Sequence, residues 1–160
     1  MITVIKIRKY QKEDLGQVCE LICCVFKQFQ SLEGTKDSVE HYLSYYNYKV
    51  NGESLNVAFL SSPIMLVAED NNKIVGVLRG KENRLVNLYV IGEYHRKGIG
   101  GRLYCEFEKR VLKLGSKQVK IRSSLYAVPF YQRYGYKKVT GVRTGKRFGS
   151  QKYQPMIKKF

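Results

Sequence analysis

The middle of the chain holds a basic, glycine-rich stretch between an apolar segment and a helical pattern. Residues 90–103 read VIGEYHRKGIGGRL. Glycines let a tight turn expose successive backbone N–H groups, and a helix start adds unpaired amides and the positive end of its dipole. Arg96, Lys97 and Arg102 add positive charge beside them. The stretch therefore predicts a strand, a turn and a helix that bind phosphate mainly through the backbone.

Two better-known phosphate-binding loops do not match this stretch. Leu103 stands where the dinucleotide-binding pattern requires its third glycine, and no suitable acidic residue follows. The P-loop also fails, because no Gly-Lys-Ser/Thr follows four residues after a glycine. The sequence indicates a phosphate-binding turn of another kind.

Apolar periodicity predicts alternating helices and strands along the rest of the chain. Helices are expected over residues 15–29, 39–46, 99–114 and 124–134. Strands are expected over residues 2–7, 64–69, 74–78, 85–91, 118–121, 136–142 and 153–157. Residues 49–63 have no clear period and are predicted to form a loop.

Two features of this order predict a mixed sheet. The run Asp70, Asn71, Asn72, Lys73 is typical of a hairpin, because Asn and Asp tolerate left-handed backbone angles. The strand, helix and strand between residues 85 and 121 favour a parallel crossover. A chain of 160 residues with 44% hydrophobic residues closes one core comfortably, so we expect a single domain.

The net charge of +16 is confined to the second part of the chain. Residues 1–93 carry 11 Lys and Arg against 11 Asp and Glu, whereas residues 94–160 carry 18 against 2, and 18 − 2 = 16. Such asymmetry predicts a polyanionic partner for this part: a phosphorylated cofactor, nucleic acid or an acidic surface.

The cysteines and the apolar runs indicate where in the cell the protein works. Cys19, Cys23, Cys24 and Cys105 show no C-x-x-C spacing, and we expect buried reduced thiols, no metal site and a cytoplasmic protein. The longest apolar run spans residues 21–26, far below the roughly 20 residues of a membrane span. We therefore expect no membrane partner.

The glycine-rich stretch resembles the signature of the GNAT superfamily of N-acetyltransferases, Gln/Arg-x-x-Gly-x-Gly/Ala between a strand and a helix. Aligning the glycines places His95 on the Gln/Arg position, with Gly98 and Gly100 matching. A second block, residues 123–136 (SSLYAVPFYQRYGY), is similar to the family's later pattern Ala-x-x-Phe-Tyr-x-x-x-Gly-Phe. The two blocks stand in the family's order and separation, which makes the pair more specific than either block.

The resemblance implies a fold, a cofactor and a set of site residues. The implied fold is α/β (α+β), one domain over residues 1–160, with a mixed, largely antiparallel central sheet and about four flanking helices. Its strands at 88–90 and 118–121 splay apart, and the pantetheine arm of acetyl-CoA lies between them. The residues implied to bind acetyl-CoA are Leu88, Tyr89, Val90, His95, Arg96, Lys97, Gly98, Ile99, Gly100, Gly101 and Arg102.

By the same resemblance, the amide of Val90 polarises the thioester carbonyl and Tyr131 stands near the departing sulfur. A tyrosine of pKa about 10 can share its proton late with a thiolate of pKa about 8.5, so Tyr131 is our general-acid candidate. In many relatives an Asn precedes the paired serines, where this chain has Arg122. The general base stays unassigned: Glu69 and Asp70 are candidates acting through water, and ordered water alone is another.

Three functions therefore remain in play. The leading one is an acetyl-CoA-dependent N-acetyltransferase that acts by direct attack of a primary amine, on a small molecule or a protein. The second is a non-catalytic acyl-CoA-binding module. The third is a nucleic-acid or ribosome-associated protein, because basic residues interleave with aromatic ones near the C-terminus. This basic band consists of Lys137, Lys138, Arg143, Lys146, Arg147, Lys152, Lys158 and Lys159. The sequence identifies no acceptor, and it leaves homodimerisation open.

Overall fold

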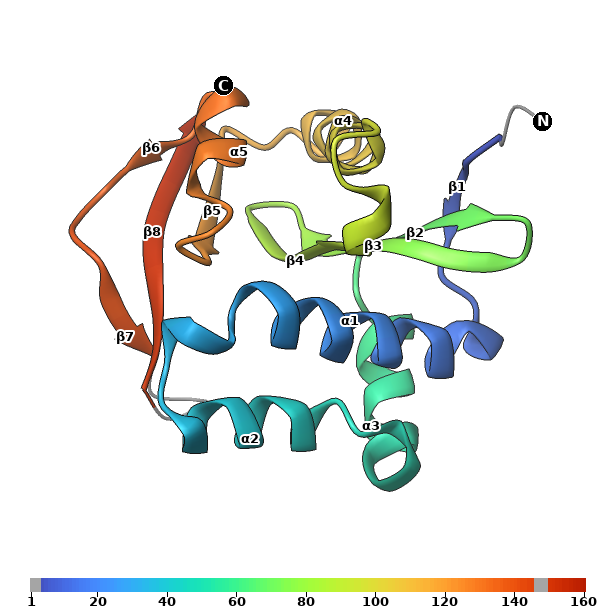
Figure 1. The fold of residues 1–160 in the computed structure, drawn as a ribbon. Coiled ribbons are helices and arrows are strands. Elements are labelled where there is room, and N and C mark those ends of the chain that lie inside the picture. The colour runs from blue at the N-terminus through green and yellow to red at the C-terminus, as the bar shows by residue number, and fades with distance from the viewer. Residues whose placement is uncertain (1–3, 146–149) are drawn as a thin grey trace.

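The computed structural model describes residues 4–145 and 150–160 (Figure 1). The α-helices are α1 (Leu15–Phe29), α2 (Lys36–Tyr45), α3 (Tyr48–Leu60), α4 (Ile99–Lys113) and α5 (Val128–Arg133). Three 3-10 turns are η1 (Lys12–Asp14), η2 (Ser31–Glu33) and η3 (Gly92–Tyr94). The strands are β1 (Lys6–Lys9), β2 (Ile64–Asp70), β3 (Lys73–Lys81), β4 (Arg84–Val90), β5 (Gln118–Ser123), β6 (Lys137–Lys138), β7 (Arg143–Gly145) and β8 (Gln151–Lys159).

The strands form one sheet in the order β1-β2-β3-β4-β5-β8-β6, with β7 paired to β8 off this path. Within the described residues β4 and β5 are the parallel pair and the other neighbours are antiparallel. The crossover between β4 and β5 runs through α4, as the sequence predicted. The mixed, largely antiparallel sheet is confirmed.

Helices cover both faces of the sheet (Figure 1). One face carries α1, α2 and α3 over a core that includes Val18, Phe26 and Phe59. The opposite face carries α4 and α5 over a second core that includes Leu103, Phe107 and Met156. No helix among the described residues has the length and apolar character that a membrane crossing requires.

Local sequence explains the elements that were predicted well. Asn71 and Asn72 adopt left-handed angles (φ 46° and 67°), so the turn between β2 and β3 has the conformation that Asn tolerates. Helix α4 ends at Lys113 because Gly115 adopts φ 81°, and the Ser116 amide bonds to the Val111 carbonyl at 3.0 Å. Leu114 lies beyond this end and is exposed, although its spacing predicted a buried position.

The prediction of a loop over residues 49–63 was wrong, because most of this segment is helix α3. Only Leu55 and Phe59 of α3 are buried, which gives a weak apolar period. The helix is also kinked at Asn51, whose φ of −109° is not helical. Asn51, Gly52, Ser54 and Asn56 are poor helix formers, so the segment lacks a helical pattern in the sequence, and packing of the two buried side chains stabilises the helix.

Several predicted strand bounds also change. The first strand was expected over residues 2–7; β1 runs from Lys6 to Lys9, and residues 1–3 lie outside the described part. The strand expected over 136–142 shrinks to Lys137–Lys138, and the last one extends to Gln151–Lys159. The short helix expected at 124–134 starts later, at Val128.

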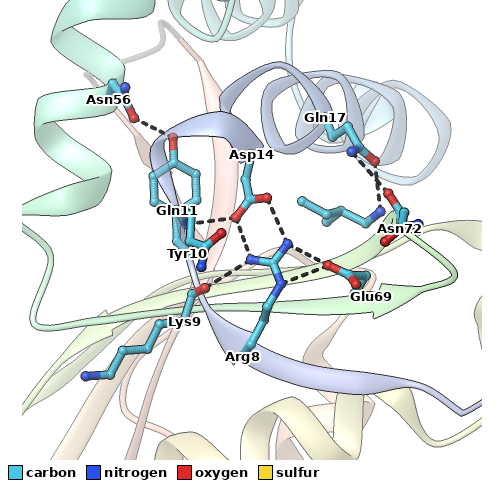
Figure 2. Close-up of polar contacts among 10 residues, drawn as sticks. Arg8, Lys9, Tyr10, Gln11, Asp14, Gln17, Asn56, Glu69 and Asn72 are labelled. Carbon is cyan, nitrogen blue, oxygen red and sulfur yellow. Dashed lines mark hydrogen bonds and ion pairs between the residues drawn. The ribbon is translucent and has the colours of Figure 1, made fainter.

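An ion-pair cluster fixes the edge strand β1 to the rest of the sheet (Figure 2). The Arg8 guanidinium donates to both Asp14 carboxylate oxygens, at 2.7 and 2.9 Å, and to Glu69 on β2 at 2.8 Å. The Gln11 amide also donates to Asp14, at 2.8 Å. Nearby, the Gln17 side chain accepts from the Ile74 amide at 2.9 Å. These bonds tie the start of α1 to the β2–β3 hairpin.

Candidate active site

The sheet opens between its two parallel strands. Strands β4 and β5 pair only at Arg84 with Lys120 and at Leu85 with Ile121. Beyond Leu85 they separate, and a cleft of about 1490 Å³ lies in the opening. Its walls come from β4, β5, the start of α4, helix α5 and the end of α1. The splayed strand pair expected from the sequence is therefore present.

The far end of β4 directs unpaired backbone groups into this cleft. The Ile91 amide donates to the Val75 carbonyl at 2.9 Å, so Ile91 pairs with β3. Polar groups alternate between the two sides of a strand, so those of Leu88 and Val90 point away from β3 and toward β5. Because β5 has separated there, the Val90 amide and both backbone groups of Leu88 are available to a ligand, whereas the Val90 carbonyl accepts from the His95 ring.

The turn between β4 and α4 presents a run of free amides. The first helical bond joins the Arg102 amide to the Gly98 carbonyl at 3.0 Å, so the amides of Ile99, Gly100 and Gly101 have no helical partner. Within the described chain the amides of Arg96, Lys97 and Gly98 also take no backbone partner. Six successive N–H groups at a helix start form an anion-binding site.

Left-handed backbone angles shape this turn. Arg96 adopts φ 59° and Gly98 adopts φ 78°. Gly98 suits this angle because it has no Cβ, and it forms the N-cap of α4. Arg96 adopts the same region as a non-glycine residue, which stores backbone strain at the site.

Gly100 and Gly101 have different surroundings. A Cβ on Gly100 would stand 3.5 Å from the Phe130 ring and 3.8 Å from Val90 Cγ2, inside the cleft lining. A Cβ on Gly101 would overlap the Tyr134 hydroxyl, on the helix that packs beside α4. Gly100 therefore keeps the cleft open, whereas Gly101 permits α4 and α5 to approach closely.

His95 lines the cleft, but both of its ring nitrogens face protein groups. Its Nε2–H donates to the Val90 carbonyl at 2.6 Å, and Nδ1 lies 3.5 Å from the Tyr126 hydroxyl. The ring stacks on Phe29, with centroids 4.6 Å apart. His95 thus ties the turn to the end of β4. Sequence reasoning missed Phe29 and Tyr126, because an aromatic residue at a helix end or in a loop carries no distinctive pattern.

Three other predicted residues lie apart from the cleft or face its other side. The Lys97 ammonium lies 5.0 Å from the Tyr94 ring centroid, and Arg102 donates to the Ile5 carbonyl at 2.9 Å; neither residue lines the cleft. Tyr89 lines it from the α2 side, where its hydroxyl lies 2.6 Å from the Tyr42 hydroxyl.

Tyr131 lies on α5 at the cleft and is 4% exposed. Its ring packs edge-on against Phe130 and Tyr136. Burial raises the pKa of Tyr131 well above its ordinary value of 10.0. No described residue forms a hydrogen bond with its hydroxyl, which leaves this proton donor available to a ligand.

The acidic residues considered as bases do not reach the cleft. Glu69 is ion-paired with Arg8 at 2.6 Å, and Asp70 accepts from the Tyr94 hydroxyl at 2.6 Å. Neither residue lines the cleft, and no described Asp or Glu does. Asp70 is joined to the cleft only through Tyr94, which does line it. Glu69 or Asp70 as a base that acts through water therefore stays a prediction.

A sheet opened between parallel strands, a turn of free amides and a buried tyrosine beside the opening define a class of proteins that bind an acyl-CoA and transfer its acyl group. Comparison with known proteins agrees. The family model described as "Acetyltransferase (GNAT) domain" matches residues 31–160. The chain therefore belongs to the GNAT acetyltransferase family, whose acetyl donor is acetyl-CoA.

Solved structures share the whole fold. The PaiA N-acetyltransferase from Thermoplasma acidophilum, solved with coenzyme A, is 24% identical with a TM-score of 0.75, covering 98% of this chain and 99% of that one. A GCN5-related N-acetyltransferase from Rhodopseudomonas palustris is 18% identical with a TM-score of 0.82, covering 100% and 99%. Ard1 from Thermoplasma volcanium is 17% identical with a TM-score of 0.69, covering 97% of each chain.

Proposed function

We propose that this acetyltransferase passes the acetyl group directly from acetyl-CoA to a primary amine while both are bound. The observation that carries the proposal is the opening between β4 and β5, which has the free amide of Val90 on one side and the Tyr131 hydroxyl on the other. Direct transfer needs a polarised carbonyl and a proton for the leaving sulfur, and these two groups supply them.

The cleft fits the cofactor at its phosphate end. Six free amides from Arg96 to Gly101 suit a pyrophosphate, and the missing side chain of Gly100 keeps the approach open. Bound there, acetyl-CoA supplies the activated acetyl group. His95 is a positioning residue in this scheme, because its bond to the Val90 carbonyl fixes the strand end whose amide faces the ligand.

The residues have separate roles in the transfer. The Val90 N–H donates to the thioester carbonyl oxygen as charge develops there. The amine nitrogen forms the new C–N bond, the C–S bond breaks, and the Tyr131 hydroxyl gives its proton to the sulfur. The proton lost by the amine returns to Tyr131 through water, since no described acidic residue lines the cleft.

Tyr131→Phe tests the proposal. Turnover should fall on the order of 10²- to 10⁴-fold, the usual cost of losing a general acid, while acetyl-CoA affinity stays within about twofold. Release of the CoA thiol against a panel of amines measures turnover, and calorimetry measures affinity. Tyr48→Phe is the matched control, because the Tyr48 hydroxyl bonds to Glu20 outside the cleft. Equal turnover by the Tyr131→Phe variant would make Tyr131 a packing residue.

The alternative of a non-catalytic acyl-CoA-binding module rests on the absence of acidic residues from the described cleft lining. It predicts tight acetyl-CoA binding with no CoA release for any amine, which the same panel detects. All four cysteines are free, but the expectation that they are buried was wrong for Cys24 and Cys105, which are exposed. Free thiols fit a reducing compartment, and we place the enzyme in the cytoplasm on that basis.

A further inference from the structure

One wall of the cleft carries polar groups that the transfer itself does not use. Strand β4 contains a bulge: Gly80 pairs with Leu85 and Arg79 with Asn87, so Val86 is an extra residue. After the bulge the side chains alternate regularly, and Asn87 lies on the same face as Tyr89, toward α1 and α2. This face of the opening is the side opposite α4 and α5.

The Asn87 side chain has a buried oxygen without a partner. Asn87 is 9% exposed and lines the cleft, and its Oδ1 forms no hydrogen bond with any described residue. Burial raises the pKa of Tyr46 and of Tyr89, and the neighbouring Asn87 side chain opposes each rise. The Asn87 amide therefore lies beside these two tyrosines, and its oxygen is free to accept a hydrogen bond from a ligand.

Arg122 brings an uncompensated positive charge to the same face. It follows Ile121 on β5, and Val119 and Ile121 point into the α4 core, so Arg122 points the other way. Its guanidinium lies 5.2 Å from the Tyr153 ring centroid, and it forms no ion pair within the described residues. Arg122 is exposed and lines the cleft.

The cleft offers nothing that would neutralise a polycation. No described acidic residue lines it, whereas Arg96, Arg122 and Arg133 do. Glu33 is an acidic residue near one rim, and its carboxylate accepts from the amides of Leu125 and Tyr126 at 2.7 and 2.9 Å. The field inside the opening therefore favours anions.

We infer that the acceptor is a small primary amine that carries its own anionic group, a carboxylate or a phosphate. Its amine N–H donates to Asn87 Oδ1, which holds the nitrogen beside the strand that faces the thioester. Its anion binds the Arg122 guanidinium, whose planar donors match both groups. This inference rests on the proposed acetyl transfer and specifies its second substrate.

Matched pairs of amines test the inference. The probes are amino acids beside their carboxamides, O-phosphoethanolamine beside ethanolamine, and spermidine. Release of the CoA thiol gives kcat/KM for each. We expect one anion-bearing series to exceed its partners without the anion by at least about tenfold in kcat/KM, because a hydrogen-bonded charge pair is lost in the partner. The carboxylate and phosphate arms identify which anion the site takes.

Two variants connect this preference to the residues. Arg122→Gln should erase it, while Lys120→Gln should preserve it; Lys120 is the matched control, since it is exposed on the same strand and outside the cleft lining. Asn87→Leu should raise the KM of the preferred amine about tenfold or more. All three variants should bind acetyl-CoA within about twofold of the parent protein.

The outcomes separate the two levels of the proposal. The inference is overturned if spermidine or the partners without the anion turn over as fast as the anion-bearing amines, or if the preference survives Arg122→Gln. Turnover of none of the anionic amines, with acetyl-CoA bound, also overturns it and leaves acetyl transfer to other amines intact. Failure of the protein to bind acetyl-CoA refutes the proposed function itself.

Discussion

At the scale of single residues, two neighbouring glycines show that one motif serves two physical needs. Gly100 borders the cleft, whereas Gly101 faces the Tyr134 hydroxyl across the contact between α4 and α5. The family pattern names the first position and is silent on the second. A sequence reading that treats Gly98, Gly100 and Gly101 as one phosphate cradle therefore merges a ligand requirement with a packing requirement.

Substitution of each glycine should separate these needs. Gly101→Ala should lower the free energy of unfolding by about 1–3 kcal/mol through overpacking. Adding Tyr134→Phe removes the hydroxyl and should recover this stability in the double variant. Gly100→Val should weaken acetyl-CoA binding at least about tenfold with little change in melting temperature. Thermal unfolding and calorimetry measure the two effects. Additive losses in the double variant would show that the Tyr134 hydroxyl is not the obstacle.

The other site residues differ in how visible they are to a sequence reading. His95, Gly98 and Tyr131 were found because they belong to spaced patterns with turn or helix chemistry. Asn87 belongs to no spaced pattern, since the bulge at Val86 and the opening beside β4 place it in the cleft lining. Arg122 was seen only as a departure from the family. The chemistry of the acceptor side depends on tertiary contacts, which no local spacing encodes.

At the scale of elements, the attachment of β1 depends on one buried carboxylate. Burial raises the pKa of Asp14, but the Arg8 side chain and the Gln11 amide together lower it by more. The pKa of Asp14 therefore lies below its ordinary value of 3.8. A depressed carboxylate pKa adds stability above the unfolded pKa, and this stability disappears as the pH falls through the folded value. The strand should therefore loosen in acid.

Asp14→Asn should lower the free energy of unfolding by about 1.5–3 kcal/mol at neutral pH, the range for hydrogen bonds to charged groups. The difference from the parent protein should shrink as the pH falls below about 4, where the parent carboxylate also takes up a proton. Urea unfolding across pH measures both. Glu13→Gln is the control, because Glu13 is exposed and forms no ion pair in the described chain. If the difference in the free energy of unfolding does not change with pH, the effect of Asp14→Asn comes from packing and not from the charge.

The helices and strands that were predicted well are those whose own residues specify them. The β2–β3 hairpin was predicted well because Asn71 and Asn72 specify the turn locally. Helix α1 was predicted to its exact bounds because its buried residues repeat at helical spacing over four turns. Helix α3 was missed because its two buried residues are too few to give a helical period.

At the scale of the whole molecule, the excess positive charge is divided among several places. Part of the predicted basic band is committed: Lys158 pairs with Glu108 at 2.8 Å. Tyr136, one of the aromatic residues interleaved with the band, is 2% exposed and has no face for stacking on a base. Lys146 and Arg147 lie outside the described residues. Arg122 and Arg133 instead face the cleft, so some of the charge serves the site.

The short pairing between β4 and β5 leaves room for an added strand. Among the described residues, the backbone hydrogen bonds along this seam come from two residue pairs and from the Lys120 amide, which donates to the Asn83 carbonyl at 2.9 Å. In the proposed complex, the arm of the cofactor takes the place of the missing strand. Acetyl-CoA at 100 times its Kd should add about 2.7 kcal/mol of stability. Amide hydrogen exchange should slow most at Leu88 and Val90, and uniform slowing along β4 would show that the cofactor does not complete the sheet.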